Sequence, residues 1–148
     1  MSLQSCTTVY GSRDAMSKYS ILIVEDHKVY SQALRRLLST NQDLNILAIL
    51  ETAEQTLAQI ADLQADLVLV DISLPKMSGL DLVEKLHGLY PEQSIAILSG
   101  HLTPDYVRRA LDAGVRGYIA KDNPGAILEG IRRILNGESY ISAEAEAI

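Results

Sequence analysis

Short aliphatic runs alternate with longer amphipathic stretches along the chain from Tyr19 onward. The aliphatic runs are rich in Ile, Val and Leu, a pattern typical of strands that are buried on both faces of a sheet. We therefore expect five strands, at residues 21–24, 44–50, 67–70, 95–98 and 115–120. Because these strands alternate with helical patterns, the sequence predicts an α/β fold in which crossover helices cover both faces of a five-stranded parallel sheet.

Local signals mark where the predicted helices begin and end. Thr52 is a favourable N-cap for the second helix, and Asn136 with Gly137 marks the end of the fifth. Residues 73–79 contain Pro and Gly and are expected to form a loop. Apolar residues at helical spacing predict two buried stripes: Leu57, Ile60 and Ala61 in the second helix, and Val107, Ala110 and Leu111 in the fourth.

The composition fits one compact domain, with 148 residues of which 47% are hydrophobic. The chain has no Trp or Phe, so we expect an aliphatic core with some of the seven Tyr at its margins. The domain is expected at residues 19–137, after a polar leader at 1–18 that we predict to be disordered. Cys6 is the single cysteine and cannot form an internal disulfide, which fits a reducing cytoplasm.

Charge and hydropathy exclude two other classes of target. The formal net charge is −6, which disfavours nonspecific attraction to nucleic-acid phosphates by this chain alone. No apolar run approaches the roughly 18 residues that a membrane span needs. We therefore expect a cytoplasmic protein that binds neither DNA nor membrane through this part of the chain.

Polar side chains follow four of the predicted strands. In an open parallel α/β sheet, ligands bind beyond the carboxyl ends of the strands. The residues at these ends are Glu25 and Asp26 after the first strand, Asp71 after the third, Ser99 after the fourth and Lys121 after the fifth. Each of them alone could be an ordinary loop or capping residue, but together they place three carboxylates, a hydroxyl and an amine at one edge of the sheet.

This set of residues predicts phosphoryl transfer. Three neighbouring carboxylates repel one another unless a cation lies between them, and Mg²⁺ is held in proteins by one or two carboxylates, waters and a phosphate oxygen. An Asp carboxylate is a known phosphoryl acceptor, so Asp71 is the candidate nucleophile. Lys121 and Ser99 would then pair with the phosphoryl oxygens, because phosphoryl transfer depends mainly on positioning and charge neutralisation.

The same motifs resemble those of response-regulator receiver domains. Four segments carry the resemblance, which extends from Tyr19 to Gly137: residues 21–27 with the acidic pair, residues 66–79 with Asp71, residues 97–100 with Ser99, and residues 117–121 with Lys121. The resemblance implies the flavodoxin-like (βα)5 fold with strand order 2-1-3-4-5. It also implies a two-component signalling domain that assists its own phosphotransfer and dephosphorylation rather than an enzyme with a separate substrate.

The resemblance also assigns roles to individual residues. It implies that Asp71 is the phosphoacceptor and that Mg²⁺ is bound by Glu25, Asp26, Asp71 and the backbone carbonyl of Ser73. It further implies that Ser99 and Tyr118 form a switch pair. In such a pair the hydroxyl of Ser99 moves toward the phosphoryl group, and the ring of Tyr118 turns inward.

The end of the chain is similar to one class of these regulators. Residues 134–142 resemble the linker entry of the NarL/LuxR class, so we expect residues 138–148 to begin a linker. The resemblance implies a sensor histidine kinase or phosphotransfer protein as partner and leaves self-association open. It implies that DNA is contacted only through a C-terminal domain that this chain does not contain.

Three other functions were weighed against this one. A haloacid-dehalogenase-like phosphatase uses a second Asp two residues after its nucleophile, where this chain has Ser73. A nucleotide or flavin binder holds phosphate on a Gly-rich loop after the first strand, where this chain has Glu25 and Asp26. The remaining alternative is a phosphorylation-independent interaction module of receiver fold, whose behaviour would not change on substitution of Asp71.

Overall fold

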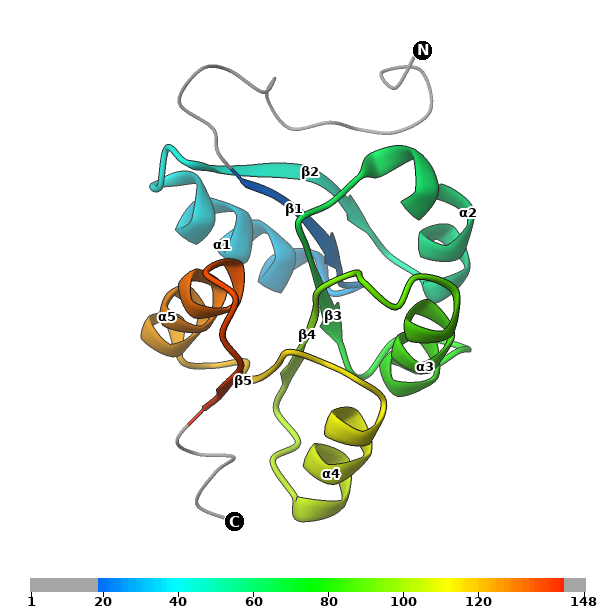
Figure 1. Ribbon diagram of the computed structural model, residues 1–148. Coiled ribbons are helices and arrows are strands. Elements are labelled where there is room, and N and C mark those ends of the chain that lie inside the picture. The colour runs from blue at the N-terminus through cyan, green and yellow to red at the C-terminus, as the bar shows by residue number, and fades with distance from the viewer. Residues whose placement is uncertain (1–18, 143–148) are drawn as a thin grey trace.

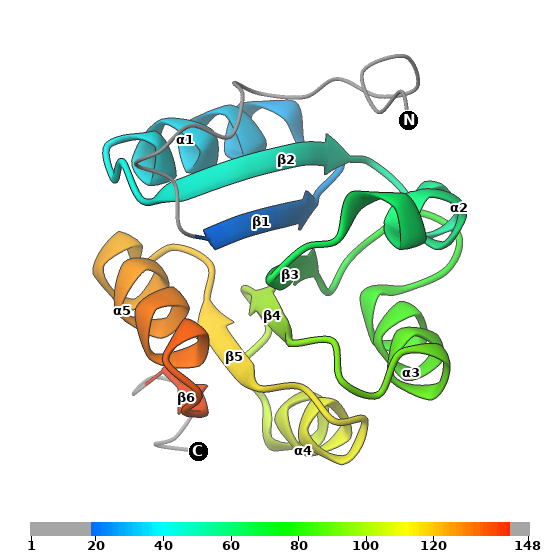
Figure 2. The same cartoon turned by 45° about the horizontal axis from the view of Figure 1, so that its top comes forward.

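The computed structural model describes residues 19–142, which form one sheet between two layers of helices (Figures 1 and 2). The sheet has six strands in the order β2-β1-β3-β4-β5-β6, and all neighbouring strands are parallel. The strands are β1 (Tyr19–Val24), β2 (Leu44–Leu50), β3 (Leu67–Asp71), β4 (Ile95–Ser99), β5 (Gly117–Ala120) and β6 (Tyr140–Ile141). The α/β fold and the strand order predicted for the first five strands are confirmed.

Five helices connect the strands and cover the sheet. They are α1 (Lys28–Ser39), α2 (Ala53–Leu63), α3 (Gly79–Leu89), α4 (Pro104–Asp112) and α5 (Pro124–Leu135). Figure 2 shows α1 and α5 on one face of the sheet and α2, α3 and α4 on the other. Among the described residues, no helix has the length and apolar character needed to cross a bilayer.

Alternation along the strands divides the core into two halves. In β1, the side chains of Ile21 and Ile23 pack with residues of α1 and α5, whereas those of Leu22 and Val24 pack with residues of α2, α3 and α4. All four are fully buried. A strand whose two faces are both buried has no side chain facing solvent, which is why the strands appear in the sequence as mainly aliphatic runs.

Two predicted helix ends are confirmed. The hydroxyl of Thr52 accepts a hydrogen bond from the backbone N–H of Gln55, and the side chain of Gln55 accepts one from the N–H of Thr52. This reciprocal capping box satisfies two N–H groups that an α-helix leaves without an internal partner. At the other end of the chain, α5 ends at Leu135, and Gly137 has a φ of +92° that favours glycine.

Three expectations about burial were wrong. Leu111 is 42% exposed and Ala61 is exposed, because the buried stripe of α4 runs through Ala110 and that of α2 through Thr56, Ile60 and Leu63. Neighbouring positions on a helix point about 100° apart, so one of two adjacent apolar residues can face the sheet while the other points away from it. Tyr118 is fully buried, so the core is not purely aliphatic.

The sheet continues past Gly137, where the predicted domain ends. The N–H of Tyr140 donates to the carbonyl of Arg116 at 3.0 Å, and that of Ser142 donates to the carbonyl of Tyr118 at 2.9 Å. The hydroxyl of Ser142, which is fully buried, accepts a hydrogen bond from the N–H of Ala120 at 2.8 Å. Part of the expected linker at 138–148 is therefore paired with β5 as β6, and the predicted leader at 1–18 lies outside the described residues.

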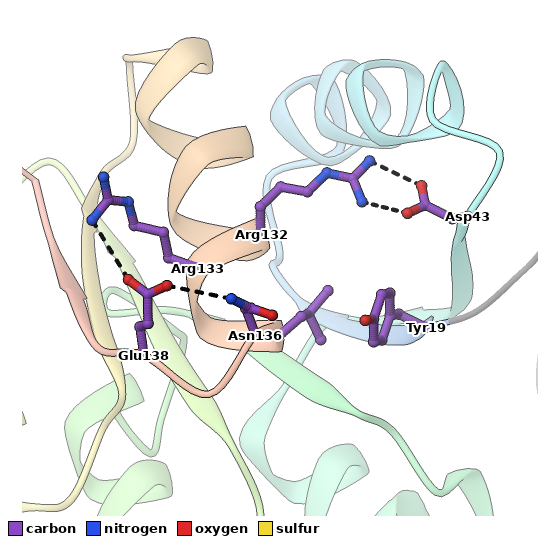
Figure 3. A pocket seen from close by; sticks show the side chains of 7 residues that line it. Tyr19, Asp43, Arg132, Arg133, Asn136 and Glu138 are labelled. Atoms are coloured by element: carbon purple, nitrogen blue, oxygen red, sulfur yellow. Dashed lines mark hydrogen bonds and ion pairs between the residues drawn. The ribbon is translucent and has the colours of Figure 1, made fainter.

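Ion pairs tie α5 to neighbouring segments near the amino-terminal ends of β1 and β2. The guanidinium of Arg132 makes a bidentate contact with the carboxylate of Asp43, just before β2 (Figure 3). This contact raises the pKa of Arg132 above its ordinary value. Arg133 pairs with Glu138 in the segment that leads to β6. Arg132 therefore joins two segments far apart in sequence, whereas Arg133 ties the end of α5 to the residues that follow it.

Candidate functional site

The predicted site residues lie at the carboxyl ends of four neighbouring strands. Glu25 and Asp26 follow β1, Asp71 ends β3, Ser99 ends β4 and Lys121 follows β5. Parallel pairing in register brings these ends to the same edge of the sheet, since Val24 is paired with Val70 and Asp71 with Leu98. The sheet topology thus positions these side chains on adjacent strands, as the sequence predicts.

The acidic residues are drawn into one buried cluster. Glu25 and Asp71 are each 1% exposed, whereas Asp26 is half-buried at the rim. Glu25, Asp26, Asp71 and His27 each offer an atom of a kind that binds metals, and these atoms lie within 4.8 Å of one another. Oδ2 of Asp71 and Oδ1 of Asp26 are buried and have no hydrogen-bond partner. Buried carboxylate oxygens that lack a hydrogen-bond donor are rare and call for an explanation. Here these two oxygens are available as the oxygen ligands that a hard divalent cation requires.

Lys121 neutralises part of this negative charge. Its Nζ lies 3.0 Å from Oε1 of Glu25 and 3.4 Å from Oδ1 of Asp71. Burial raises the pKa of Glu25, and the charge of Asp71 raises it further, while the backbone N–H of His27 and the ammonium of Lys121 act in the opposite direction. Three carboxylates against one ammonium leave the cluster with an excess of negative charge, which a bound cation would balance.

The backbone around Asp71 is fixed by a close helix contact. A Cβ on Gly79, the first residue of α3, would lie 2.3 Å from the carbonyl oxygen of Asp71 and 2.7 Å from Cα of Ile72. The N–H of Gly79 also donates to the carbonyl of Ile72 at 3.0 Å. Only glycine lets α3 approach the end of β3 this closely. In the loop between β3 and α3, the N–H of Ser73 donates a hydrogen bond to Oδ1 of Asp71 at 3.3 Å.

Ser99 and Tyr118 lie beside the cluster and share a partner. The hydroxyl of Ser99 accepts a hydrogen bond from the N–H of His101 at 2.7 Å and donates to the carbonyl of His101 at 3.1 Å. The phenol of Tyr118 donates to the same carbonyl. Burial raises the pKa of Tyr118, so its hydroxyl remains a proton donor. Ser99 is therefore engaged with the loop before α4, and the ring of Tyr118 is turned inward.

Three groups near the site were not singled out by the sequence. His27 is exposed, and its Nδ1 lies 3.0 Å from Oε2 of Glu25 and 3.5 Å from Oδ1 of Asp26. Its position directly after the acidic pair was the available signal. The carbonyl of His101 and the ring of Tyr30 gave no such signal, because a backbone acceptor and a helix residue are brought to the site only by tertiary packing.

Comparison with known proteins identifies the family of this chain. The family model for the response regulator receiver domain matches residues 21–132. The chain is 36% identical over 124 residues to the transcriptional activator protein ExaE of Pseudomonas putida, covering 82% of this chain and 57% of that protein. It is 32% identical over 126 residues to the transcriptional regulatory protein DesR of Bacillus subtilis, covering 84% and 62%. The chain thus spans less than two thirds of the length of these relatives.

A solved structure supports the same assignment. A CheY-like response regulator receiver domain protein from Methanospirillum hungatei matches with a TM-score of 0.74 and 33% identity, covering 82% of this chain and 96% of that one. A LuxR-family response regulator from Aurantimonas matches with a TM-score of 0.85, covering 88% and 94%, and at 23% identity this likeness concerns the fold. The chain belongs to the response regulator receiver domain family, and its relatives are transcriptional regulators.

Proposed function

We propose that this chain is the cytoplasmic, phosphate-accepting input domain of a two-component transcriptional regulator and that Asp71 is the acceptor. The observation that supports this most strongly is the state of the Asp71 carboxylate. It is buried at the end of the central strand β3, lies 3.4 Å from an ammonium through Oδ1, and keeps Oδ2 without a hydrogen-bond donor. A carboxylate held in this way is oriented and has a free oxygen with which to attack phosphorus.

The chain's own residues would hold a Mg²⁺ ion beside the acceptor. Asp26 and Asp71 offer carboxylate oxygens that have no hydrogen-bond donor, Glu25 completes the acidic cluster, and the backbone carbonyl of Ser73 is the further ligand that we assign. When bound, Mg²⁺ would neutralise carboxylate charge and bind an oxygen of the incoming phosphoryl group. Without such compensation, the negative charge of the cluster would repel a phosphate donor.

Asp71 acts as the nucleophile in the transfer. Its carboxylate oxygen forms a bond to phosphorus as the bond between phosphorus and the donor breaks, and the donor leaves with the electron pair. With acetyl phosphate the leaving group is acetate, and the product is an aspartyl phosphate. Lys121 neutralises charge on the phosphoryl oxygens, because its Nζ already lies within 3.4 Å of the acceptor carboxylate.

Ser99 and Tyr118 would transmit the modification. A phosphoryl group on Asp71 offers new acceptor oxygens, to which the hydroxyl of Ser99 donates after leaving the carbonyl of His101. That carbonyl keeps the phenol of Tyr118 as a donor, so the loop before α4 moves as a unit with the buried ring. A local change of hydrogen bonds at Asp71 is thereby passed to the surface formed by α4 and β5.

The partners follow from the relatives of this chain. A sensor histidine kinase or a phosphotransfer protein would supply the phosphoryl group. The relatives are transcriptional regulators that extend beyond the region matched by this chain. We therefore assign DNA binding to a further domain of the full protein and treat homodimerisation as the step that links the two.

Phosphoryl uptake from acetyl phosphate tests the proposal. Intact-mass spectrometry of the wild-type protein should show the gain of one phosphoryl group in the presence of Mg²⁺ and none after chelation of the metal. Asp71→Asn should abolish the gain, whereas Asp62→Asn, a matched change on the exposed face of α2, should retain it. Uptake by Asp71→Asn would overturn the assignment. Absence of uptake from both acetyl phosphate and a histidine-kinase donor would favour an interaction module that works without phosphorylation.

A further inference from the structure

Tyr30 in α1 contacts both ends of Lys121, a residue 91 positions away in sequence. The phenol of Tyr30 donates a hydrogen bond to the backbone carbonyl of Lys121 at 2.6 Å. The ammonium of the same lysine lies over the ring of Tyr30, with Nζ 4.5 Å from the ring centroid. One aromatic side chain therefore fixes the main chain of Lys121 and attracts its charged group.

The ring lies at the edge of a groove between α1 and α5. This groove has a volume of about 480 Å³, and Ala33, Leu34, Leu37, Pro124 and Ile127 line it beside the ring of Tyr30. Most of these side chains are apolar, so the ring is packed on one side by aliphatic groups and faces the ammonium on the other. Such a half-buried ring attracts a cation more strongly than an exposed one, because less water competes for the ammonium.

The hydroxyl of Tyr30 stays protonated at neutral pH. Burial raises the pKa of Tyr30 above its ordinary value of 10.0, and the negative charges of Glu25 and Asp71 raise it further. The phenol therefore remains a donor to the carbonyl of Lys121 over the range in which the protein works. The negative ring face remains available to the ammonium as well.

Two carboxylates and the solvent compete for the ammonium of Lys121. Glu25 attracts it at 3.0 Å from within the core, Asp71 attracts it at 3.4 Å, and the side chain is still 19% exposed to solvent. Only an ammonium that lies between the two carboxylates can reach oxygens on a phosphoryl group at Asp71. A ring beneath the ammonium limits its rotation toward solvent and supports this intermediate position.

We propose that Tyr30 is a positioning residue that holds Lys121 in the orientation needed to neutralise the phosphoryl group on Asp71. The proposal rests on the function proposed above and adds a residue outside the five strand-end positions. Its action is indirect, since Tyr30 contacts neither Asp71 nor the transferred group, and its effect requires the ammonium of Lys121. Tyr30→Leu removes both contacts, whereas Tyr30→Phe keeps the ring and removes only the hydroxyl.

The rate of phosphoryl uptake from acetyl phosphate is the first test. Tyr30→Leu should lower the Mg²⁺-dependent rate about tenfold, with a smaller loss for Tyr30→Phe because the ring is retained. In a Lys121→Met background the Tyr30→Leu change should cause little further loss. Tyr90→Leu, a matched change after α3 on a half-exposed tyrosine, should leave the rate unaltered. Equal rates for wild type and Tyr30→Leu, or additive losses with Lys121→Met, would overturn the proposal.

A second measurement does not depend on phosphorylation. Proton resonances of the Lys121 side chain should be shifted upfield by the Tyr30 ring in wild type and Tyr30→Phe, and should return to ordinary values in Tyr30→Leu. Circular dichroism would confirm that each variant is folded. If the wild type takes up no phosphoryl group, the function proposed above fails, whereas the resonances still decide whether the ring holds Lys121. Unshifted resonances in the wild type would refute the positioning role.

Discussion

At the scale of single residues, the site contains charged side chains that are buried among mainly apolar residues. Glu25 and Asp71 are almost fully buried, and Lys121 lies within 3.4 Å of both. Removing a carboxylate from water costs free energy that one ammonium recovers only in part. The raised pKa of Glu25 expresses this cost, because the folded protein binds a proton at Glu25 more readily than the unfolded chain does.

Glu25→Gln should therefore stabilise the metal-free protein at neutral pH. Below the ordinary pKa of 4.5, Glu25 is protonated in both the folded and the unfolded protein, so variant and wild type should have similar stability. As the pH rises from 4.5 through the raised pKa of the folded state, the wild type should lose stability relative to the variant. Thermal unfolding in a chelating buffer between pH 4 and pH 8 measures the difference. A lower midpoint for Glu25→Gln at neutral pH would contradict this account.

Some residues of the site could be predicted from the sequence and others could not, for physical reasons. Glu25, Asp71 and Lys121 could be predicted to converge because they follow parallel strands, whose carboxyl ends meet at one edge. Tyr30 could not be linked to Lys121, since its position on α1 depends on how that helix packs against α5. The carbonyl of His101 was equally hidden, because any residue can present a backbone acceptor.

At the scale of elements, buried runs were easier to predict than helix faces. The strands are mostly aliphatic and buried on both faces, so the aliphatic runs predicted them, and Thr52 with Gly137 marked helix ends by local chemistry. Leu111 was predicted to be buried but is exposed, because adjacent apolar residues in a short helix do not show which face of the helix packs against the sheet. β6 escaped prediction because its two residues pair through backbone groups that leave no hydrophobic pattern.

The contact of α3 with the end of β3 can be tested at Gly79. Gly79→Ala should destabilise the protein by about 1–3 kcal/mol, because its Cβ would meet the backbone of Asp71 and force a shift. The same shift should slow phosphoryl uptake by displacing Asp71. Gly88→Ala lies in the same helix with no atom within 4 Å of the added Cβ and should stabilise by about 0.5–1 kcal/mol. Urea unfolding gives both values, and similar effects of the two changes would refute the close-contact explanation.

One buried hydroxyl adds to the backbone hydrogen bonds that pair β6 with β5. Ser142→Ala should cost about 1–3 kcal/mol, because the N–H of Ala120 would lose its acceptor in a buried position. Hydrogen exchange at the amide of Ala120 should accelerate in this variant. Ser139→Ala, in the exposed segment before β6, provides the control and should change neither quantity. Unchanged protection of Ala120 in Ser142→Ala would show that the hydroxyl does not hold the strand.

At the scale of the whole molecule, the receiver is a rigid sheet that carries a charged cluster at one edge and ion pairs at the other. Helices on both faces hold β1 and β3 in register, and this register sets the spacing of the acidic residues. Near the opposite edge, Arg132 pairs with Asp43 before β2, and Arg133 pairs with Glu138 just after α5 (Figure 3). The excess negative charge of the cluster opposes folding, and a bound cation would relieve it.

Mg²⁺ should accordingly stabilise the whole fold. A ligand that binds only the folded state at 100 times its Kd adds about 2.7 kcal/mol to the free energy of unfolding. Urea unfolding with and without Mg²⁺, at ionic strength matched with KCl, measures this gain. Asp26→Asn removes one of the free carboxylate oxygens and should reduce the gain. An equal gain in wild type and Asp26→Asn would argue against binding at the acidic cluster.

The most direct test of the central claim is to locate the phosphoryl group on the chain. Wild-type protein treated with acetyl phosphate and Mg²⁺ can be reduced with borohydride, which converts an aspartyl phosphate to homoserine, and then digested for peptide mass spectrometry. We predict homoserine at position 71 and unmodified side chains at Asp26 and His27. Modification at Asp26 or His27 with Asp71 intact would contradict the account, because the buried carboxylate beside Lys121 would then not be the acceptor.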